Sequence, residues 1–333
     1  QELQRRYEEL EDGKEDTSPV MDADEIIKPL KDFLKVQPNN YKVLERLIAV
    51  LRRMGLLDEV PAYLASAEKN DKRSIAHSGY HFCKGLYARY TNDIIQAIQH
   101  FNLSRKDVKS SYGEDSLIHM VELYLNPDQD GIWTAAIEEG GGGGSPSSRG
   151  RSSSSYVSDS TLENLRVADV LLDELKPICR DKRRLVVLEC YSLMATRLKH
   201  KVDQAMNSFI DLLESDAEYL PAILGMATGF MIDKNQHKAR NILKRVGKMD
   251  MLHHDGEDFE KANLFLAKFS ADKTKNDNQT QELCKKCLVN NKSCSQAWDI
   301  LGTSYERDMD FVHACECYEK VSMCGVMQCS VTV

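Results

Sequence analysis

The chain has 333 residues, of which 42% are hydrophobic and 29% charged, and its formal net charge is −8. This negative balance argues against a nucleic-acid-binding surface, because phosphates are bound mainly by clustered lysine and arginine. No apolar run approaches the roughly 18 residues of a membrane span, so we expect no direct membrane insertion. Ten cysteines are too sparse for a small disulfide scaffold and favour a reduced intracellular compartment.

The N-terminal third predicts helical repeats. Residues 1–21 are charged and form a separate segment, and from residue 22 apolar side chains recur every three or four positions, the spacing of an amphipathic helix. The next apolar residues fit a helix–turn–helix unit, with a glycine in the turn: Leu44, Leu47, Leu51, Gly55, Val60, Leu64 and Ala67. A further unit contains Gly85, Ala97, Phe101 and Ser104. We assign residues 22–135 to the first part of an α-solenoid.

Residues 136–160 are dominated by glycine and serine, including five consecutive glycines. Such a segment buries too little apolar surface to offset the entropy of ordering it. We therefore predict a disordered, flexible insertion between two parts of the solenoid.

Helical sequence resumes over residues 161–321, the predicted second part. Ala205, Phe209 and Leu212 recur 34 residues later, and 34 residues is the period of the tetratricopeptide repeat. One complete unit of this pattern comprises Ile223, Met226, Ala227, Phe230, Ala239, Leu243 and Val246.

The final unit matches the tetratricopeptide signature most fully. Its positions are Trp298, Leu301, Gly302, Tyr305, Ala314, Tyr318 and Val321. We expect Gly302 to let the partner helix approach closely and Ala314 to fill the gap opposite it. The predicted fold is an all-α tetratricopeptide-repeat α-solenoid, a right-handed superhelix, followed by an irregular tail over residues 322–333. Because no capping helix follows, we expect a truncated or alternative ending.

Metal, cofactor and catalytic sites are not predicted. Cys284 and Cys287, with Cys294 and the Cys315–Cys317 pair, suggest zinc by their spacing, but Cys284 and Cys287 fall at core-facing helix positions, where free cysteine packs as a small hydrophobe. The adjacent residues His253, His254 and Asp255 rarely converge on one ion. No nucleophile frame or phosphate loop is present, so we expect neither a cofactor nor an enzyme.

A basic stripe on one helix is the candidate docking site for an acidic partner, against the simpler interpretation of a solvated face: Arg240, Lys244, Arg245 and Lys248. Chaperone-binding repeats clamp a carboxylate with Lys and Asn at positions 5 and 9. The pairs at these positions here cannot form such a clamp. They are Asp299 and Thr303, Leu224 and Thr228, and Glu45 and Ala49.

Several longer strings, which include loop and non-core residues, resemble the tetratricopeptide repeat protein 21 family across residues 22–321. They include YHFCKGLYARYTND, AIQHFNLSRKD, PAILGMATGFM and ARNILKRVGKMD. A ciliary member of that family is a subunit of intraflagellar transport complex A. The resemblance implies a non-enzymatic scaffold for retrograde ciliary transport and receptor trafficking, in the cytoplasm, the cilium and its basal body. The implied partners are other complex A subunits and ciliary membrane-protein cargo adaptors. The alternative is a free-standing peptide-binding adaptor or co-chaperone.

Overall fold

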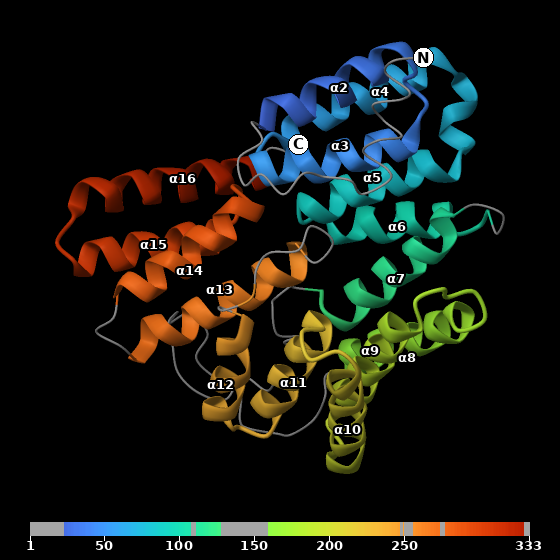
Figure 1. Ribbon diagram of the computed structural model, residues 1–333. Coiled ribbons are helices and arrows are strands. Elements are labelled where there is room, and N and C mark those ends of the chain that lie inside the picture. Colours follow the sequence, from blue (N-terminus) through green and yellow to red (C-terminus); the bar gives the residue numbers. More distant parts are fainter. Residues whose placement is uncertain are drawn as a thin grey trace. The chain divides into compact units, whose positions relative to one another are not determined.

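A computed structural model describes residues 23–107, 111–127, 159–246, 249, 256–273 and 277–329. Every regular element in these ranges is a helix (Figure 1), which confirms the all-α prediction. Most of the predicted insertion and the charged residues 1–21 lie outside the described ranges.

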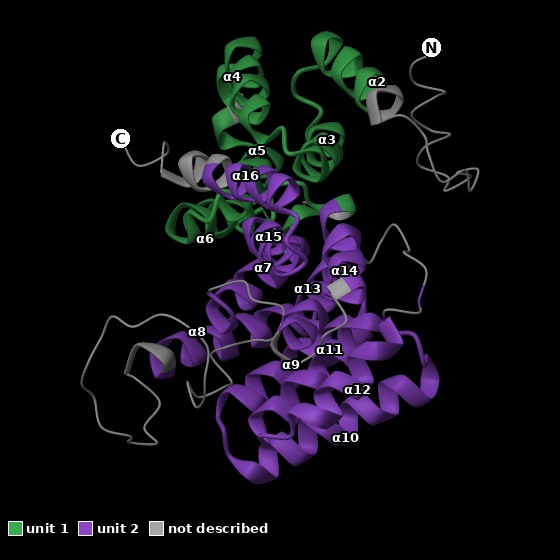
Figure 2. Cartoon of the chain, turned by 90° about the vertical axis from the view of Figure 1, so that its left-hand side faces the viewer, with its two compact units in different colours: residues 1–113, 289–294, 324–333 green, residues 114–288, 295–323 purple. Residues whose placement is uncertain are grey.

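The chain divides into two compact units (Figure 2): residues 1–113, 289–294 and 324–333 form unit 1, and residues 114–288 and 295–323 form unit 2. The helices that fall mainly in unit 1 are α2 (Ala23–Val36), α3 (Tyr41–Met54), α4 (Val60–Asn70), α5 (Ser78–Tyr90) and α6 (Ile94–Ser104), with the short 3-10 turns η1 (Leu57–Glu59) and η2 (Lys72–Ala76). Those mainly in unit 2 are α7 (Tyr112–Leu125), α8 (Asp159–Leu175), α9 (Lys182–Ala195), α10 (Lys199–Ser215), α11 (Leu220–Ile232), α12 (Gln236–Val246), α13 (Gly256–Lys273), α14 (Asp277–Asn290), α15 (Ser295–Arg307) and α16 (Phe311–Cys329).

Several consecutive helices pack side by side, as helix–turn–helix repeats require, most extensively α5 with α6, α9 with α10 and α11 with α12. Helices such as α3 and α12 bury one apolar stripe against their neighbours, whereas α11 is buried on all sides from Leu220 to Gly229. In unit 1 the fully buried side chains include Leu44, Leu47, Leu51 and Phe101. In unit 2 they include Phe209, Leu188, Met194 and Leu175. Each core is therefore built from the positions that the 3- to 4-residue spacing predicts.

Three boundaries differ from the predicted ones. The prediction of an irregular tail from residue 322 is wrong as far as Cys329, because α16 continues to that residue and no proline interrupts it. Helix α8 begins at Asp159, inside the predicted insertion. Helix α7 lies almost wholly in unit 2, so the first stretch of unit 1 ends at residue 113, before the predicted boundary at residue 135.

The turn inside a repeat has a recurring backbone. One of the first two residues after the first helix has a positive φ at five such turns in the described chain: Gly55 (73°), Asn92 (62°), Arg197 (57°), Lys234 (57°) and Met309 (62°). At four of these turns the next N–H donates to the carbonyl five residues earlier: Leu56 to Leu51, Asp93 to Ala88, Asn235 to Phe230 and Asp310 to Tyr305. This is the Schellman motif, which satisfies the last carbonyls of a helix. Gly55 and Asn92 are residue types that favour this conformation, whereas Arg197, Lys234 and Met309 are types that rarely adopt it.

Candidate functional site

The glycines of the repeats lie against bulky side chains of a packed helix. A Cβ added at Gly302 would lie 2.9 Å from the ring of Tyr318, and one added at Gly85 would lie 2.8 Å from the ring of Phe101. Both pairs are 16 positions apart, so they share one place in the repeat. The atoms closest to Gly302 belong to Tyr318 and Cys317 rather than to Ala314, which corrects the expected partner. The position-24 aromatic side chain fills this space.

The other predicted repeat positions are divided between core and rim. The buried ones are Ile223, Met226, Ala227, Ala239, Leu243, Val246, Leu301 and Ala314. The partly exposed ones are Phe230, Trp298, Tyr305 and Val321, and Tyr318 is exposed. The large aromatic side chains therefore cover the edges of the helix pairs, and the small and aliphatic ones fill the centre.

The basic stripe of α12 is not one free cationic face. The Nη2 of Arg245 donates to the carbonyl of Ala217, 2.6 Å away. The Nε of Arg240 is buried and has no hydrogen-bond partner within the described chain. Lys244 is exposed, and Lys248 lies outside the described residues. Docking of an acidic partner along this stripe stays a prediction.

The cysteines of the predicted motif do not converge on one point. Cys284, Cys287 and Cys317 are buried, whereas Cys315 is exposed. The Cys287 thiol donates to the carbonyl of Glu260 at 3.3 Å, which places it in the packing between α13 and α14. No group of three His, Cys, Asp or Glu side chains that could hold a metal occurs among the residues described. His253, His254 and Asp255 fall outside them.

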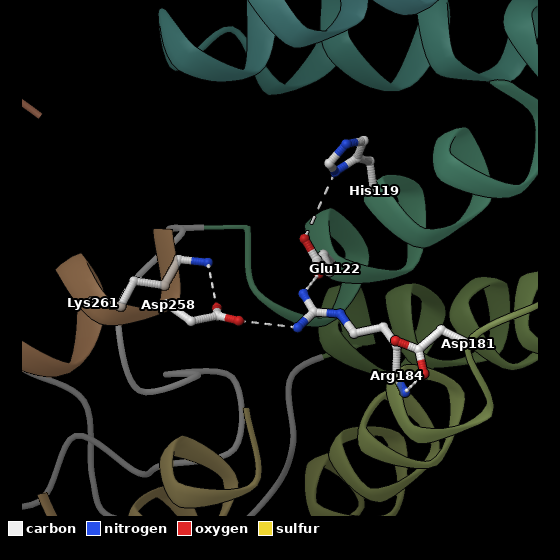
Figure 3. A network of polar contacts seen from close by, with 6 residues as sticks. All are labelled: His119, Glu122, Asp181, Arg184, Asp258 and Lys261. Atoms are coloured by element: carbon white, nitrogen blue, oxygen red, sulfur yellow. Dashed lines mark hydrogen bonds and ion pairs between the residues drawn. The ribbon is translucent and has the colours of Figure 1, made fainter. Parts of the chain in front are cut away.

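An ionic network centred on Arg184 is a largely buried charged cluster in unit 2 (Figure 3). The guanidinium of Arg184, on α9, pairs with the Glu122 carboxylate of α7 and, at 3.2 Å, with the Asp258 carboxylate of α13. The side chains of Glu122 and Asp258 are only 8% and 16% exposed. Lys261 lies 3.7 Å from Asp258, and His119 lies 3.8 Å from Glu122.

This network holds three helices together through one permanent cation. Burial alone would lower the pKa of Arg184, but the charges of Glu122 and Asp258 raise it. Asp181 is the N-cap of α9, and its side chain accepts from the backbone N–H groups of Arg183 and Arg184. This cap fixes the backbone of the first turn, from which the Arg184 side chain extends. The sequence does not reveal the network, because its partners are 62 and 74 residues away from Arg184.

A second polar cluster lies in unit 1, between α5 and α6. The rings of His81 and His100 stack, with their Nδ1 atoms 3.2 Å apart. Burial, with the nearby charge of Lys84, lowers the pKa of His100 to about 4, and burial also lowers the pKa of His81. Both rings are therefore neutral at pH 7, and one can donate N–H to the other. The pair explains why His81 stands at a repeat position that normally holds an apolar side chain.

Comparison with known families agrees with this architecture. Residues 20–125 match the model described as "TT21 fifth ARM repeats domain", and residues 167–331 match the "Tetratricopeptide repeat protein 21 C-terminal ARM domain". The chain belongs to the tetratricopeptide repeat protein 21 family. The family resemblance drawn from the sequence is thereby confirmed on both sides of the insertion.

Individual relatives give the same result. The chain is 38% identical to human tetratricopeptide repeat protein 21B over 277 residues, which are 83% of the chain and 20% of the relative. It is 33% identical to mouse tetratricopeptide repeat protein 21A over 287 residues, 86% of the chain and 21% of the relative. The chain thus spans about a fifth of the length of these relatives.

A solved tetratricopeptide repeat protein from Parabacteroides merdae shares the fold, with a TM-score of 0.52 and 13% identity over 91% of this chain and 97% of that one. Together with the family matches, this fold makes the chain a tetratricopeptide-type helical-repeat scaffold. Within the described ranges, no helix is both long and apolar enough to cross a membrane.

An open pocket of about 460 Å³ lies in unit 1, where the ends of several helices meet. Its lining is mostly amide and aromatic: Val36, Gln37, Asn39, Asn40, Tyr41, Lys42, Asn70, His77 and Tyr112. The Nδ1 of His77 accepts from the N–H of Gly79 at 3.0 Å, so this histidine begins α5. The pocket was not predicted, because its lining comes from four separate stretches of sequence.

Proposed function

We propose that this chain is a non-enzymatic protein–protein interaction scaffold, a part of a subunit of intraflagellar transport complex A. The observation that carries the proposal is that two models of one family match most of the chain, on either side of the insertion. In that role it serves retrograde ciliary transport and receptor trafficking. Its partners are other complex A subunits and ciliary membrane-protein cargo adaptors, and its location is the cytoplasm, the cilium and the basal body.

The physical properties of the fold support a scaffold. Stacked helical repeats make contacts mainly with their neighbours and leave long outer surfaces for partners. The polar groups that this chain brings together hold helices to one another: the Arg184 network joins α7, α9 and α13, and the histidine pair joins α5 and α6. Their geometry serves stability, which is what a binding platform requires.

The co-chaperone alternative is disfavoured by the positions that would clamp a carboxylate. Leu224 and Thr228 are buried, and the Thr228 hydroxyl donates to the carbonyl of Leu224 at 3.0 Å. In the last unit the Thr303 hydroxyl likewise donates to the carbonyl of Asp299, whose own carboxylate would repel a carboxylate ligand. Neither pair presents the cation and amide that such a clamp uses.

The test is affinity purification of the tagged full-length protein from ciliated cells, followed by mass spectrometry. We expect complex A subunits in near-stoichiometric amounts. The control is the same protein carrying Arg184→Ala, which weakens unit 2 and should reduce the recovery of subunits that dock there. Recovery of chaperones without transport subunits would contradict the proposal.

A further inference from the structure

The turn between α15 and α16 exposes a compact apolar surface in unit 2. Met309, Phe311 and Val312 are 71%, 54% and 70% exposed, respectively. They lie within four consecutive residues at the connection between α15 and α16, a helix pair that Figure 1 labels, so three large apolar side chains are exposed close together along the chain. Scattered exposed apolar side chains are ordinary on soluble proteins, but a contiguous group marks an interaction site.

The same turn elsewhere in unit 2 shows that the fold does not require these apolar residues. The turn between α11 and α12 has the same positive φ and the same 6→1 hydrogen bond, from Asn235 to Phe230. The start of the second helix is also capped in the same way. The Asn235 side chain accepts from the N–H of Lys238, as the Asp310 side chain accepts from the N–H of His313. At the places of Met309, Phe311 and Val312 it has exposed polar residues: Lys234, Gln236 and His237.

Most of the charged residues that flank the turn along the chain are carboxylates. Glu306, Asp308, Glu316 and Glu319 are exposed, and the Asp310 side chain is 39% exposed. The nearby Arg307 is exposed but donates from Nη1 to the carbonyl of Ala271, which directs its guanidinium towards α13. Lys320 is the remaining lysine or arginine between residues 306 and 320. We call these flanking charged residues the rim. Their carboxylates outnumber their lysine and arginine, so the rim is acidic.

We propose that the α15–α16 turn, defined by Met309, Phe311 and Val312, is a docking surface for a basic amphipathic segment of a partner protein. Apolar side chains of the partner cover the patch, and its lysines or arginines meet the acidic rim. This combination of apolar contact and complementary charge provides both affinity and orientation. The inference rests on the proposed scaffold function but is independent of the ciliary assignment.

The probe is a fluorescein-labelled helical peptide of about 15 leucine and lysine residues, long enough to form a helix, with a leucine–glutamate counterpart as control. Binding to the purified chain is followed by fluorescence anisotropy at physiological salt. The test variant is Phe311→Gln with Val312→His, which installs the residues that α12 has at these positions. The matched control is Ile95→Gln on α6, an equally exposed site at the equivalent turn of unit 1.

We expect the lysine peptide to bind the parent chain and Ile95→Gln alike, and to bind the double variant roughly tenfold or more weakly. The rim variant Glu316→Lys with Glu319→Lys should also weaken binding, and the glutamate peptide should not bind. Equal binding to the double variant, or binding of the glutamate peptide, overturns the proposal.

A second copy of the chain as the occupant is a different outcome, recognised in sedimentation as a dimer that the double variant abolishes, and it too overturns the proposal. Circular dichroism confirms that each variant is folded. Failure of the peptide to bind while complex A subunits are still recovered from cells would refute this surface and leave the proposed function standing.

Discussion

Arg184 of α9 donates from Nη1 to the Asp258 carboxylate of α13, 3.2 Å away in space and 74 residues further along the chain. The Nη2 atom of Arg184 donates to the carboxylate of Glu122 on α7. One side chain therefore links three helices that no short-range pattern brings together. Removing it would take from two mostly buried carboxylates the cation that they share.

We expect Arg184→Ala to lower the free energy of unfolding by about 3–5 kcal/mol, because uncompensated buried charges are costly. The adjacent Arg183 is a matched control: it makes a 3.3 Å pair with Asp216, and both side chains are about half exposed. Arg183→Ala should cost less than about 1 kcal/mol. Urea denaturation measures both, and equal losses would show that the network adds no stability.

Neutralising the whole network should restore part of the loss. In Arg184→Met with Glu122→Gln and Asp258→Asn neither carboxylate remains to lack the arginine, so we expect a stability closer to the parent than that of Arg184→Ala. If the triple variant is as unstable as Arg184→Ala, the loss of stability comes from the lost packing of the arginine stem and not from unpaired charges. The same urea titration makes the comparison.

Two glycines that each pack against an aromatic ring should respond differently to alanine. A Cβ at Gly225 would overlap the ring of Phe209, which is fully buried. We expect Gly225→Ala to cost about 1–3 kcal/mol, the typical cost of overpacking a core. At Gly302 the opposing Tyr318 is 37% exposed and can move outward. The gain in helix propensity, up to about 1 kcal/mol, then offsets the crowding at Gly302.

Thermal unfolding of the two alanine variants tests this difference. Gly256→Ala is the control, because no atom of the described residues lies within 4 Å of a Cβ built there. A loss at Gly302 as large as that at Gly225 would mean that Tyr318 is held as firmly as the buried Phe209.

The left-handed turn residues predict stabilising substitutions. Lys234 and Met309 carry φ values of 57° and 62°, which cost a residue with a Cβ about 1 kcal/mol relative to glycine. Lys234→Gly and Met309→Gly should therefore raise the melting temperature. Asn92→Gly should change it less, because asparagine tolerates this conformation. The reverse change, Gly55→Ala at φ 73°, should lower it, and a gain there would contradict the proposed role of the turn.

The histidine pair predicts a dependence of stability on pH. An unfolded histidine titrates near pH 6.5, whereas burial lowers the pKa of His100 to about 4 in the folded chain. Between these values the unfolded state binds more protons, so stability is complete above pH 6.5 and falls as the pH drops towards 4. We expect a loss of about 1 kcal/mol, since the ring is half-buried and partly screened by solvent.

Carboxylates titrate in part of the same range, so the informative measurement is a difference. His100→Gln should unfold with a flatter pH profile between 6.5 and 4 than the parent chain. His237→Gln, on the exposed face of α12, is the control and should leave the profile unchanged. Parallel profiles for His100→Gln and the parent would show that His100 is protonated equally easily in both states.

Periodicity in the sequence was enough to identify the helices and their core. Leu44, Leu47, Ala239 and Leu243 lie where a 34-residue repeat predicts, because a helix has only one way to bury a stripe at 3- to 4-residue spacing. Gly55 indicated the turn after α3, because glycine adopts a positive φ without steric cost. Sequence patterns misjudged the tail after Val321, since the absence of a repeat match does not prevent a helix from continuing.

What the periodicity left open was decided by contacts between residues distant in the chain. Arg184 is one cation among many until folding brings Glu122 and Asp258 to it, and His81 is a poor repeat match until His100 stacks on it. The residues of the predicted basic stripe of α12 have different surroundings in the fold, because Arg245 donates a hydrogen bond to the carbonyl of Ala217. Helix formation depends on neighbours a few residues away, which a sequence displays directly. Charge pairing, burial and the exposure of Phe311 and Val312 depend on which helices meet, and only the tertiary structure determines that.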